Sequence, residues 1–264
     1  MNTAYLEKLF GMDGKKAVIT GGASGLGRAI AYSLSQFGAE VFLLDRNPEG
    51  LAESAQIIRE AGGACHTYEL DISDTQAQDR FFDEFLQKEK HLDIFVADAG
   101  INIRSELPDA KLEDIKTLLQ TNYIGTVYGM IRAANIMKPQ RSGNILVITS
   151  VNGVSPLINQ AVYSSIKAGL EGAMRCLAGT MAEYGVRVNS CAPGCIYSNG
   201  NKHMFSQEVY RKAKEANIPL GKIGNPEDIG DVVAAVVSDA FRFMVGSTVL
   251  VDGGEIMRPK QVQP

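Results

Sequence analysis

The chain has 264 residues, of which 45% are hydrophobic and 21% are charged, and it contains 27 glycines. This composition is typical of a globular protein that buries a large core, and it excludes a disordered or fibrous chain. The formal net charge is −4 and the sequence has no long lysine and arginine run, which argues against a nucleic-acid-binding protein and for a small-molecule partner.

Short runs of β-branched residues alternate with longer amphipathic stretches along the whole chain. The first half predicts strands at 17–20, 41–45, 64–69 and 94–97, with helices between and after them at 25–37, 48–61, 74–89 and 112–136. The second half predicts a strand at 145–149, a helix at 160–183 and a strand at 186–191. A looser segment to 217, a helix at 226–238 and a strand at 247–252 complete the pattern. Strands that are apolar on both faces and alternate with helices are typical of a parallel sheet covered by helices on each side. No Pro/Ser-rich linker or internal repeat interrupts the pattern, so the sequence predicts a single domain over 1–264 with a doubly wound, Rossmann-like α/β fold.

The cysteines and histidines indicate neither a disulfide framework nor a metal site. The four cysteines form no CxxC pair, and although Cys191 and Cys195 are close in sequence, the three histidines provide no suitably spaced partners. The opening stretch, MNTAYLEKLF, is polar and acidic where a signal peptide would be basic and then apolar. We therefore expect a cytoplasmic protein with no bound metal and no membrane partner.

A glycine-rich turn, TGGASGLG at 20–27, joins the first strand to the first helix. Such a turn exposes backbone N–H groups and the positive end of the helix dipole, which together suit a pyrophosphate. The alternative is a tight turn that needs glycine for backbone reasons alone. The candidate contacts to a dinucleotide in this turn are Gly21, Ser24, Gly25, Leu26 and Gly27.

Asp45 ends the second predicted strand, about twenty residues after the glycines, where a carboxylate can accept both hydroxyls of the adenosine ribose. A 2′-phosphate would be repelled there, so Asp45 favours NAD over NADP as the cofactor. Arg46 leaves the alternative open, because a guanidinium could hold that phosphate if Asp45 turned away. The stretch 45–48 also has the pattern of a turn and N-cap that begin the next helix.

Tyr163 and Lys167 are four residues apart in a predicted helix, so their side chains lie on one face. By itself such a pair is most often part of a solvated face, but Ser150 stands at the carboxyl end of the fifth predicted strand, where open α/β sheets bind ligands. A phenol loses its proton near pH ~10 in isolation. We expect Lys167, together with the positive charge of a nicotinamide, to lower the pKa of Tyr163 by about two to three units, so that Tyr163 can act as an acid/base.

Several motifs taken together resemble the short-chain dehydrogenase/reductase family over nearly the whole chain. They are Thr20-Gly21-x3-Gly25-x-Gly27, Asp71-Ile72, Ala99-Gly100, Asn122, Ser150, Tyr163-x3-Lys167, Pro193-Gly194 and Asp252-Gly253-Gly254. The resemblance implies an NAD(P)-dependent oxidoreductase that interconverts a secondary alcohol and a ketone. It implies that Tyr163 takes the alcohol proton while Ser150 binds the substrate oxygen. It further implies that Lys167 holds the nicotinamide ribose and that Asn122 positions a water leading to solvent.

The resemblance also implies cofactor contacts beyond the glycine-rich turn and Asp45. They are Asp71, Ile72, Ala99, Gly100, Tyr163, Lys167, Pro193, Gly194, Ile196 and Ser198. Ser198 stands where many relatives have threonine, and Ala97-Asp98 stands where the family usually has two asparagines. The first of these two changes removes one expected ribose contact, and we expect Asp98 to make a structural hydrogen bond inside the sheet.

The substrate is expected to lie against the segments that follow Gly100, Ser150 and Gly194, including a substrate loop near 195–217. The polar content of these segments favours a sugar, sugar acid or polyol over a steroid or fatty-acyl substrate. The candidate substrate residues are Arg104, Asn152, Tyr197 and His203, with Asn159, Asn199 and Asn201 adding polar groups. The stretches 9–15 and 99–104 are also similar to bacterial gluconate and deoxygluconate dehydrogenases of this family. If Arg104 points inward, it can bind a sugar-acid carboxylate through two hydrogen bonds.

Other functions and an assembly remain open. A 3-oxoacyl-acyl-carrier-protein ketoreductase would prefer NADPH and carry a basic docking patch, against which Asp45 and the net charge count. A non-catalytic NAD-binding sensor would not need Ser150 and the Tyr/Lys pair together, and a carbohydrate epimerase or dehydratase is a further alternative. Relatives are commonly homotetramers, so a homodimer or homotetramer is expected, with the predicted helices at 112–136 and 160–183 as subunit faces.

Overall fold

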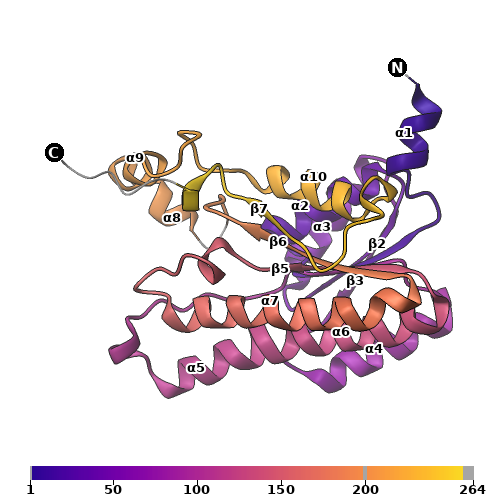
Figure 1. Ribbon diagram of the computed structural model, residues 1–264, viewed down its shortest axis with the longest axis horizontal. Coiled ribbons are helices and arrows are strands. Elements are labelled where there is room, and N and C mark those ends of the chain that lie inside the picture. Colours follow the sequence, from indigo (N-terminus) through magenta and orange to yellow (C-terminus); the bar gives the residue numbers. More distant parts are fainter. Residues whose placement is uncertain (1, 199–200, 258–264) are drawn as a thin grey trace.

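The computed structural model describes residues 2–198 and 201–257, which fold around one sheet of seven strands (Figure 1). The strand order is β3-β2-β1-β4-β5-β6-β7, and every neighbouring pair is parallel. The strands are β1 Lys16–Thr20, β2 Glu40–Asp45, β3 Cys65–Glu69, β4 Ile94–Ala97, β5 Gly143–Ile148, β6 Val186–Pro193 and β7 Thr248–Val251. The predicted parallel α/β fold is confirmed.

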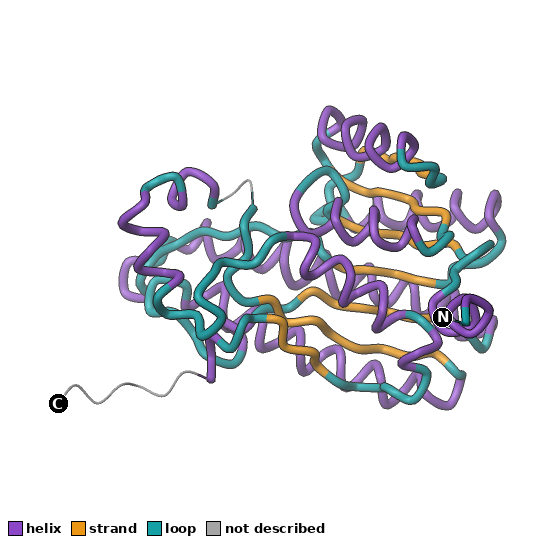
Figure 2. The backbone as a smooth tube through the Cα atoms, turned by 90° about the horizontal axis from the view of Figure 1, so that it is seen from above, coloured by secondary structure: helices purple, strands orange, loops and turns teal. Residues whose placement is uncertain are grey.

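Helices cover both faces of this sheet, and Figure 2 shows the strands side by side beneath them. On one face lie α2 Gly25–Gln36, α3 Pro48–Glu60 and α10 Pro226–Val237; on the other lie α4 Thr75–Glu89, α5 Leu112–Leu118, α6 Thr126–Gln140 and α7 Ala161–Met181. In β1, Val18 packs into the core on one face while Ala17 and Ile19 pack into the core on the other. This burial on both faces explains why the strand reads as a continuous apolar run.

The start of α3 follows local sequence rules. The Asn47 side chain accepts a hydrogen bond from the Gly50 N–H at 3.1 Å, and Pro48 is the first helical residue. Proline suits this position because its missing N–H would have no partner there. The prediction of a turn and N-cap at 45–48 is therefore confirmed.

Three short helices lie where the apolar pattern predicts none: α1 Thr3–Phe10, α8 Lys202–Phe205 and α9 Glu208–Glu215. Neither α1 nor α9 has a buried residue, and most side chains of α9 are charged, so neither is a long core-facing helix of the kind that the apolar pattern detects. α9 instead carries the i,i+4 ion pairs Lys212–Glu208 and Arg211–Glu215. The segment predicted as loose up to 217 is thus partly helical.

The predicted helix at 112–136 is interrupted and longer than expected. α5 ends at Leu118, a π-helical turn spans Leu119–Gly125, and α6 then runs to Gln140. A Cβ on Gly125 would lie 2.5 Å from the Ile72 carbonyl oxygen, so glycine lets this turn approach the segment after β3. π-helical turns occur often at functional sites. Within the described ranges, no helix combines the length and apolar character that crossing a bilayer requires.

The strand order sets where a ligand can bind. From β1 the chain crosses to β2 on one side, while β4 lies against the other side of β1. Crossovers that leave in opposite directions open a crevice beyond the carboxyl ends of the strands between them. The ends of β1 and β4 therefore border the expected site.

Candidate active site

A cavity of about 900 Å³ opens beyond the carboxyl ends of the strands. The predicted cofactor and catalytic residues that line it are Gly21, Ser24, Gly25, Leu26, Asp45, Asp71, Ile72, Ala99, Gly100, Ser150, Tyr163, Lys167, Pro193, Gly194, Ile196 and Ser198. The predicted substrate-side residues that line it are Arg104, Asn152, Asn159, Asn201 and His203. The structure therefore brings together, in one cavity, groups that lie far apart in the sequence.

Three predicted residues do not line this cavity: Gly27, Asn122 and Tyr197. The ring of Tyr197 instead packs edge-on against Phe205, with ring centroids 5.3 Å apart. Tyr197 is therefore a packing residue of the substrate loop in this structure. Asn199 lies outside the described residues.

The glycine-rich turn has both a backbone requirement and an open face. A Cβ on Gly27 would lie 2.2 Å from the Gly21 carbonyl oxygen, so no larger residue fits where the first turn of α2 crosses the chain. Gly25, with a φ of 56°, would direct a Cβ into open space with no atom within 4 Å. Backbone geometry thus explains Gly27, while the surface around Gly25 fits a phosphate at the N-terminus of α2.

Asp45 is fixed at the rim of the cavity by two backbone donors. Its carboxylate accepts from the Ala23 N–H at 3.2 Å and from the Asn47 N–H at 3.0 Å. Arg46 lies next to it with a 69% exposed side chain, 4.0 Å from the Asp71 carboxylate. Asp45 therefore has a set orientation, whereas the guanidinium of Arg46 is held only by a surface ion pair.

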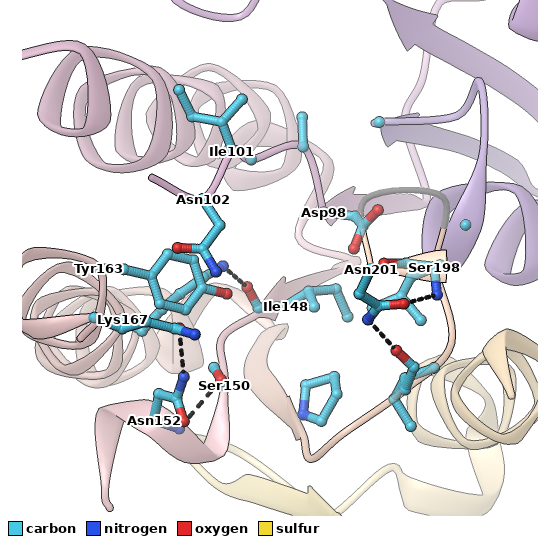
Figure 3. Close-up of a pocket in the computed structure, with 18 of the residues that line it drawn as sticks. Asp98, Ile101, Asn102, Ile148, Ser150, Asn152, Tyr163, Lys167, Ser198 and Asn201 are labelled. Carbon is cyan, nitrogen blue, oxygen red and sulfur yellow. Dashed lines mark hydrogen bonds between the residues drawn. The ribbon is translucent and has the colours of Figure 1, made fainter. Parts of the chain in front are cut away.

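Ser150, Tyr163 and Lys167 come together as the spacing predicts (Figure 3). In this view Tyr163, Lys167, Ser150 and Asn152 lie on one side of the pocket. The Lys167 ammonium donates to the Ile148 carbonyl oxygen at 2.8 Å and lies 5.6 Å from the centre of the Tyr163 ring. The Ser150 hydroxyl accepts from the Asn152 N–H at 3.1 Å. β5 and α7 thus present a hydroxyl, a phenol and an ammonium to one volume.

Burial shifts the pKa values of both members of the Tyr/Lys pair. Burial raises the pKa of Tyr163 to about 12, although a hydrogen bond with Ser150 opposes this rise. Burial lowers the pKa of Lys167 to about 8, against the attraction of Asp98 and Glu171. Removal from water disfavours phenolate in the chain alone, so the lowering of the Tyr163 pKa by the ammonium and a nicotinamide together stays a prediction.

Asn122 acts on the loop after β4 from the π-helical turn. Only 1% exposed, it accepts from the Ile101 N–H at 2.8 Å and donates to the Ile101 carbonyl oxygen at 2.7 Å. Both ends of its amide are thereby engaged by one backbone residue. Asn122 holds the segment that follows Gly100 in place along the cavity.

Asp98 follows the last residue of β4, and its carboxylate does not make the expected hydrogen bond inside the sheet. The N–H groups of Asp98 and Ala99 both donate to the Thr20 hydroxyl at 3.1 Å, but the Asp98 carboxylate lines the cavity. Burial raises the pKa of Asp98 to about 7, with the nearby charge of Lys167 opposing the rise. Asp98 lies one position beyond the strand, and its Oδ2 atom lies against Gly21 and Gly27 of the glycine-rich turn.

The substrate end of the cavity is polar and includes residues that the sequence did not single out. The Arg104 guanidinium lies 3.4 Å from the Met204 sulfur of α8, and Asn152 donates to Gln160 at 2.9 Å. The additional polar residues at this end are Asn102, Gln160, Lys214 and Glu255, the last two of which form an ion pair. Lys214 lies on α9 and Glu255 follows β7, so no sequence motif connects them.

The described residues contain no group of three or more histidine, cysteine, aspartate or glutamate side chains arranged to hold a metal ion. The cysteines Cys65, Cys176, Cys191 and Cys195 are free thiols.

Comparisons with known proteins agree with this arrangement. A family model described as "Enoyl-(Acyl carrier protein) reductase" matches residues 21–255. The chain is 33% identical to 3beta-hydroxysteroid dehydrogenase 1 of Eggerthella lenta over 94% of its length and 96% of that protein. It is also 33% identical to Glucose 1-dehydrogenase 2 of Bacillus subtilis over 96% of its length and 98% of that protein.

A solved structure from Agrobacterium tumefaciens, assigned as a 2-deoxy-D-gluconate 3-dehydrogenase and holding NADP, is 30% identical, with a TM-score of 0.88. The match covers 94% of this chain and 99% of that one. With the parallel sheet, the glycine-rich turn and the shared cavity, these similarities show that the chain belongs to the short-chain dehydrogenase/reductase family of oxidoreductases acting on CH–OH groups.

Proposed function

We propose that the protein is an NAD(H)-dependent dehydrogenase that interconverts a secondary alcohol and a ketone on a sugar, sugar acid or polyol. The observation that carries this proposal is the convergence of Ser150, Tyr163 and Lys167 on the cavity that the glycine-rich turn also lines. A binding protein without turnover would not need these three groups in that volume.

The chain's own residues divide the work in this mechanism. Tyr163 takes the proton of the substrate hydroxyl, and Ser150 donates a hydrogen bond to the substrate oxygen. Lys167 holds a positive charge in the same volume, and Asn122 keeps the wall after β4 in place through Ile101. A bound nicotinamide dinucleotide supplies the hydride carrier and, when oxidised, further positive charge in the cavity. Burial raises the pKa of Tyr163 to about 12. Its ionisation near neutral pH therefore requires the positive charges of both Lys167 and an oxidised nicotinamide.

The function is tested by following absorbance of the reduced cofactor with NAD+ or NADP+. The panel contains polyols, sugar acids, simple secondary alcohols and, in the reverse direction, a 3-oxoacyl thioester. Turnover of a polyhydroxylated compound with NAD+ supports the proposal. Turnover of the thioester alone would replace it with the ketoreductase alternative, and cofactor binding without any turnover would point to a sensor.

Asp45 is the residue that supports NAD over NADP, although the solved relative from Agrobacterium tumefaciens holds NADP. We expect the wild-type protein to have the higher kcat/KM with NAD+. Asp45→Ala should raise the ratio of kcat/KM for NADP+ to that for NAD+ by at least about tenfold, because a carboxylate repels a 2′-phosphate at close range. The double variant with Arg46→Ala should lose most of that gain. A wild-type preference for NADP+ would contradict the assignment.

Arg104 supports an acidic substrate, because its guanidinium lines the cavity and has only the Met204 sulfur as a recorded partner among the described residues. Arg104→Ala should raise KM for a sugar acid by roughly tenfold or more, since a charge-assisted pair is lost, and leave KM for a neutral polyol within about twofold. The matched control is Arg80→Ala, whose side chain is 64% exposed and pairs with Asp74 outside the cavity. Equal KM values for the sugar acid in wild type and Arg104→Ala would remove Arg104 from the site.

We further propose that the described elements act as one domain and that the protein forms a homodimer or homotetramer. Support for assembly comes from exposed apolar side chains along the segment of α5 and α6, which are Leu112, Leu119, Ile124 and Ile131. Such a row on a helical face is typical of a subunit contact.

A further inference from the structure

Asp98 places a carboxylate beneath the turn that is proposed to bind the cofactor's pyrophosphate. A Cβ on Gly21 or on Gly27 would lie 3.0 Å from its Oδ2 atom, so the carboxylate packs directly against both ends of the turn. The Gly27 N–H, in the first turn of α2, interacts with the same carboxylate. In Figure 3, Asp98 lies across the pocket from Tyr163 and Lys167.

The first turn of a helix has only a few free N–H groups and a limited positive potential. The Asp98 carboxylate takes part of that potential, and a pyrophosphate bound at the same turn would compete for it. If both groups are charged, they repel each other at the turn in a partly dry site, where repulsion is stronger than in water. A proton on Asp98 removes this repulsion.

The other charged groups around Asp98 come from three elements. Lys167 on α7 attracts the carboxylate, and Asp45 at the end of β2 repels it. The Tyr163 phenol on α7 and the Cys191 thiol on β6 also feel its charge, and each has a pKa raised to about 12. The contribution of α2 is the Gly27 N–H, which interacts with the Asp98 carboxylate. Lys167 is therefore the cation that offsets the half-buried Asp98 carboxylate.

We infer that Asp98 is the proton-binding residue of the cofactor site, so that a dinucleotide pyrophosphate binds together with a proton that Asp98 takes from solvent. The inference rests on the proposed dinucleotide site. It adds to that site a residue whose protonation changes the charge next to the pyrophosphate. Because burial raises the pKa of Asp98 to about 7, the free protein is partly deprotonated there at neutral pH, and ligand binding completes its protonation.

The sign of the expected pH dependence follows from this proton. Above the pKa of Asp98 the free protein has lost this proton, whereas the complex still holds it. Cofactor binding should therefore weaken as pH rises above about 7, with Kd increasing by up to about tenfold per pH unit. Below about pH 6, where Asp98 already holds its proton, Kd should be nearly constant.

Calorimetric titration with ADP-ribose tests the inference without turnover, because this ligand carries the pyrophosphate but no nicotinamide. Titrations in two buffers of different ionisation enthalpy count the protons taken up on binding. Wild-type protein near pH 7.5 should take up a large fraction of one proton, roughly half or more. Adenosine, which has no phosphate to reach the turn, should bind without proton uptake and serves as the matched ligand control.

Asp98→Asn keeps the side-chain shape and removes the charge, so the proton uptake on binding ADP-ribose near pH ~7.5 should fall well below that of wild type. Any uptake that remains belongs to Lys167, whose pKa burial lowers to about 8. At pH ~8 Asp98→Asn should bind ADP-ribose more tightly than wild type by roughly tenfold. Uptake in Asp98→Asn as large as in wild type, or no uptake in wild type, overturns the inference and leaves the proposed function intact. Failure of wild type to bind ADP-ribose, NAD+ and NADP+ would instead overturn the dinucleotide site itself.

Discussion

Tyr163→Phe should lower kcat by about 10²- to 10⁴-fold, the range that a positioned general acid/base contributes. The substitution removes the phenol oxygen that exchanges a proton with the substrate and leaves a ring of nearly the same shape at a half-buried position. The Kd of the cofactor should stay within a few fold, because the glycine-rich turn and Asp45 are unchanged. Steady-state turnover and a cofactor titration measure the two effects separately.

The matched control is Tyr32→Phe, which removes a phenol from a side chain that is 37% exposed on α2 and does not line the cavity. Its kcat should be within about twofold of wild type, as for most surface changes. If Tyr163→Phe retained more than about a tenth of wild-type kcat, Tyr163 would not be the acid/base. Ser150 would then have to be re-examined as the proton-transferring group.

Arg187→Met should destabilise the protein by roughly 1.5–3 kcal/mol, the range for hydrogen bonds made by a charged group. Arg187 lies on β6, is 9% exposed and donates to carbonyl oxygens in the last turn of α10 and in the segment that follows it. Its recorded acceptors are those of Val236 at 3.1 Å, Ser238 at 3.0 Å, Phe241 at 3.1 Å and Met244 at 3.5 Å. Methionine fills the space but removes the Arg187 donor from all four carbonyl oxygens. Those of Ser238, Phe241 and Met244 keep a second donor, which is the Phe241 N–H, the Met244 N–H and the Asn189 amide, respectively.

Urea or thermal unfolding measures this loss, with Arg175→Met as the control. The Arg175 side chain is 58% exposed and pairs with Glu171 at 3.3 Å, so its replacement should change the free energy of unfolding by about 1 kcal/mol or less. Equal stability of the two variants would mean that the carbonyls after α10 find other partners or water. In that case Arg187 would not be the group that ties β6 to the end of α10.

The elements that could be predicted from the sequence are those whose pattern reports burial directly. β1 and β4 read as short apolar runs because both of their faces are covered, and Asn47-Pro48 marks the start of α3 by local capping chemistry. α9 could not be found in this way, because it is short, has no buried residue and consists mostly of charged side chains. The π-helical turn at Leu119–Gly125 was also missed, since its backbone differs from that of an α-helix without a distinctive residue pattern.

The candidate site shows the same division. Gly25, Asp45, Ser150, Tyr163 and Lys167 were found because motif spacing places each of them relative to its own strand or helix. Gln160, Lys214 and Glu255 were not, because their proximity depends on how α7, α9 and the chain after β7 pack around one cavity.

The sequence by itself determined the parallel α/β fold, the family and the candidate reacting groups, because these follow from periodicity and short-range spacing. Only the tertiary structure decided the electrostatics of the site. It buried Tyr163 enough to raise its pKa to about 12, and it placed Asp98 against the glycine-rich turn. Desolvation and charge–charge energies depend on distances between segments and on how much water packing excludes, and neither quantity can be read from the order of residues.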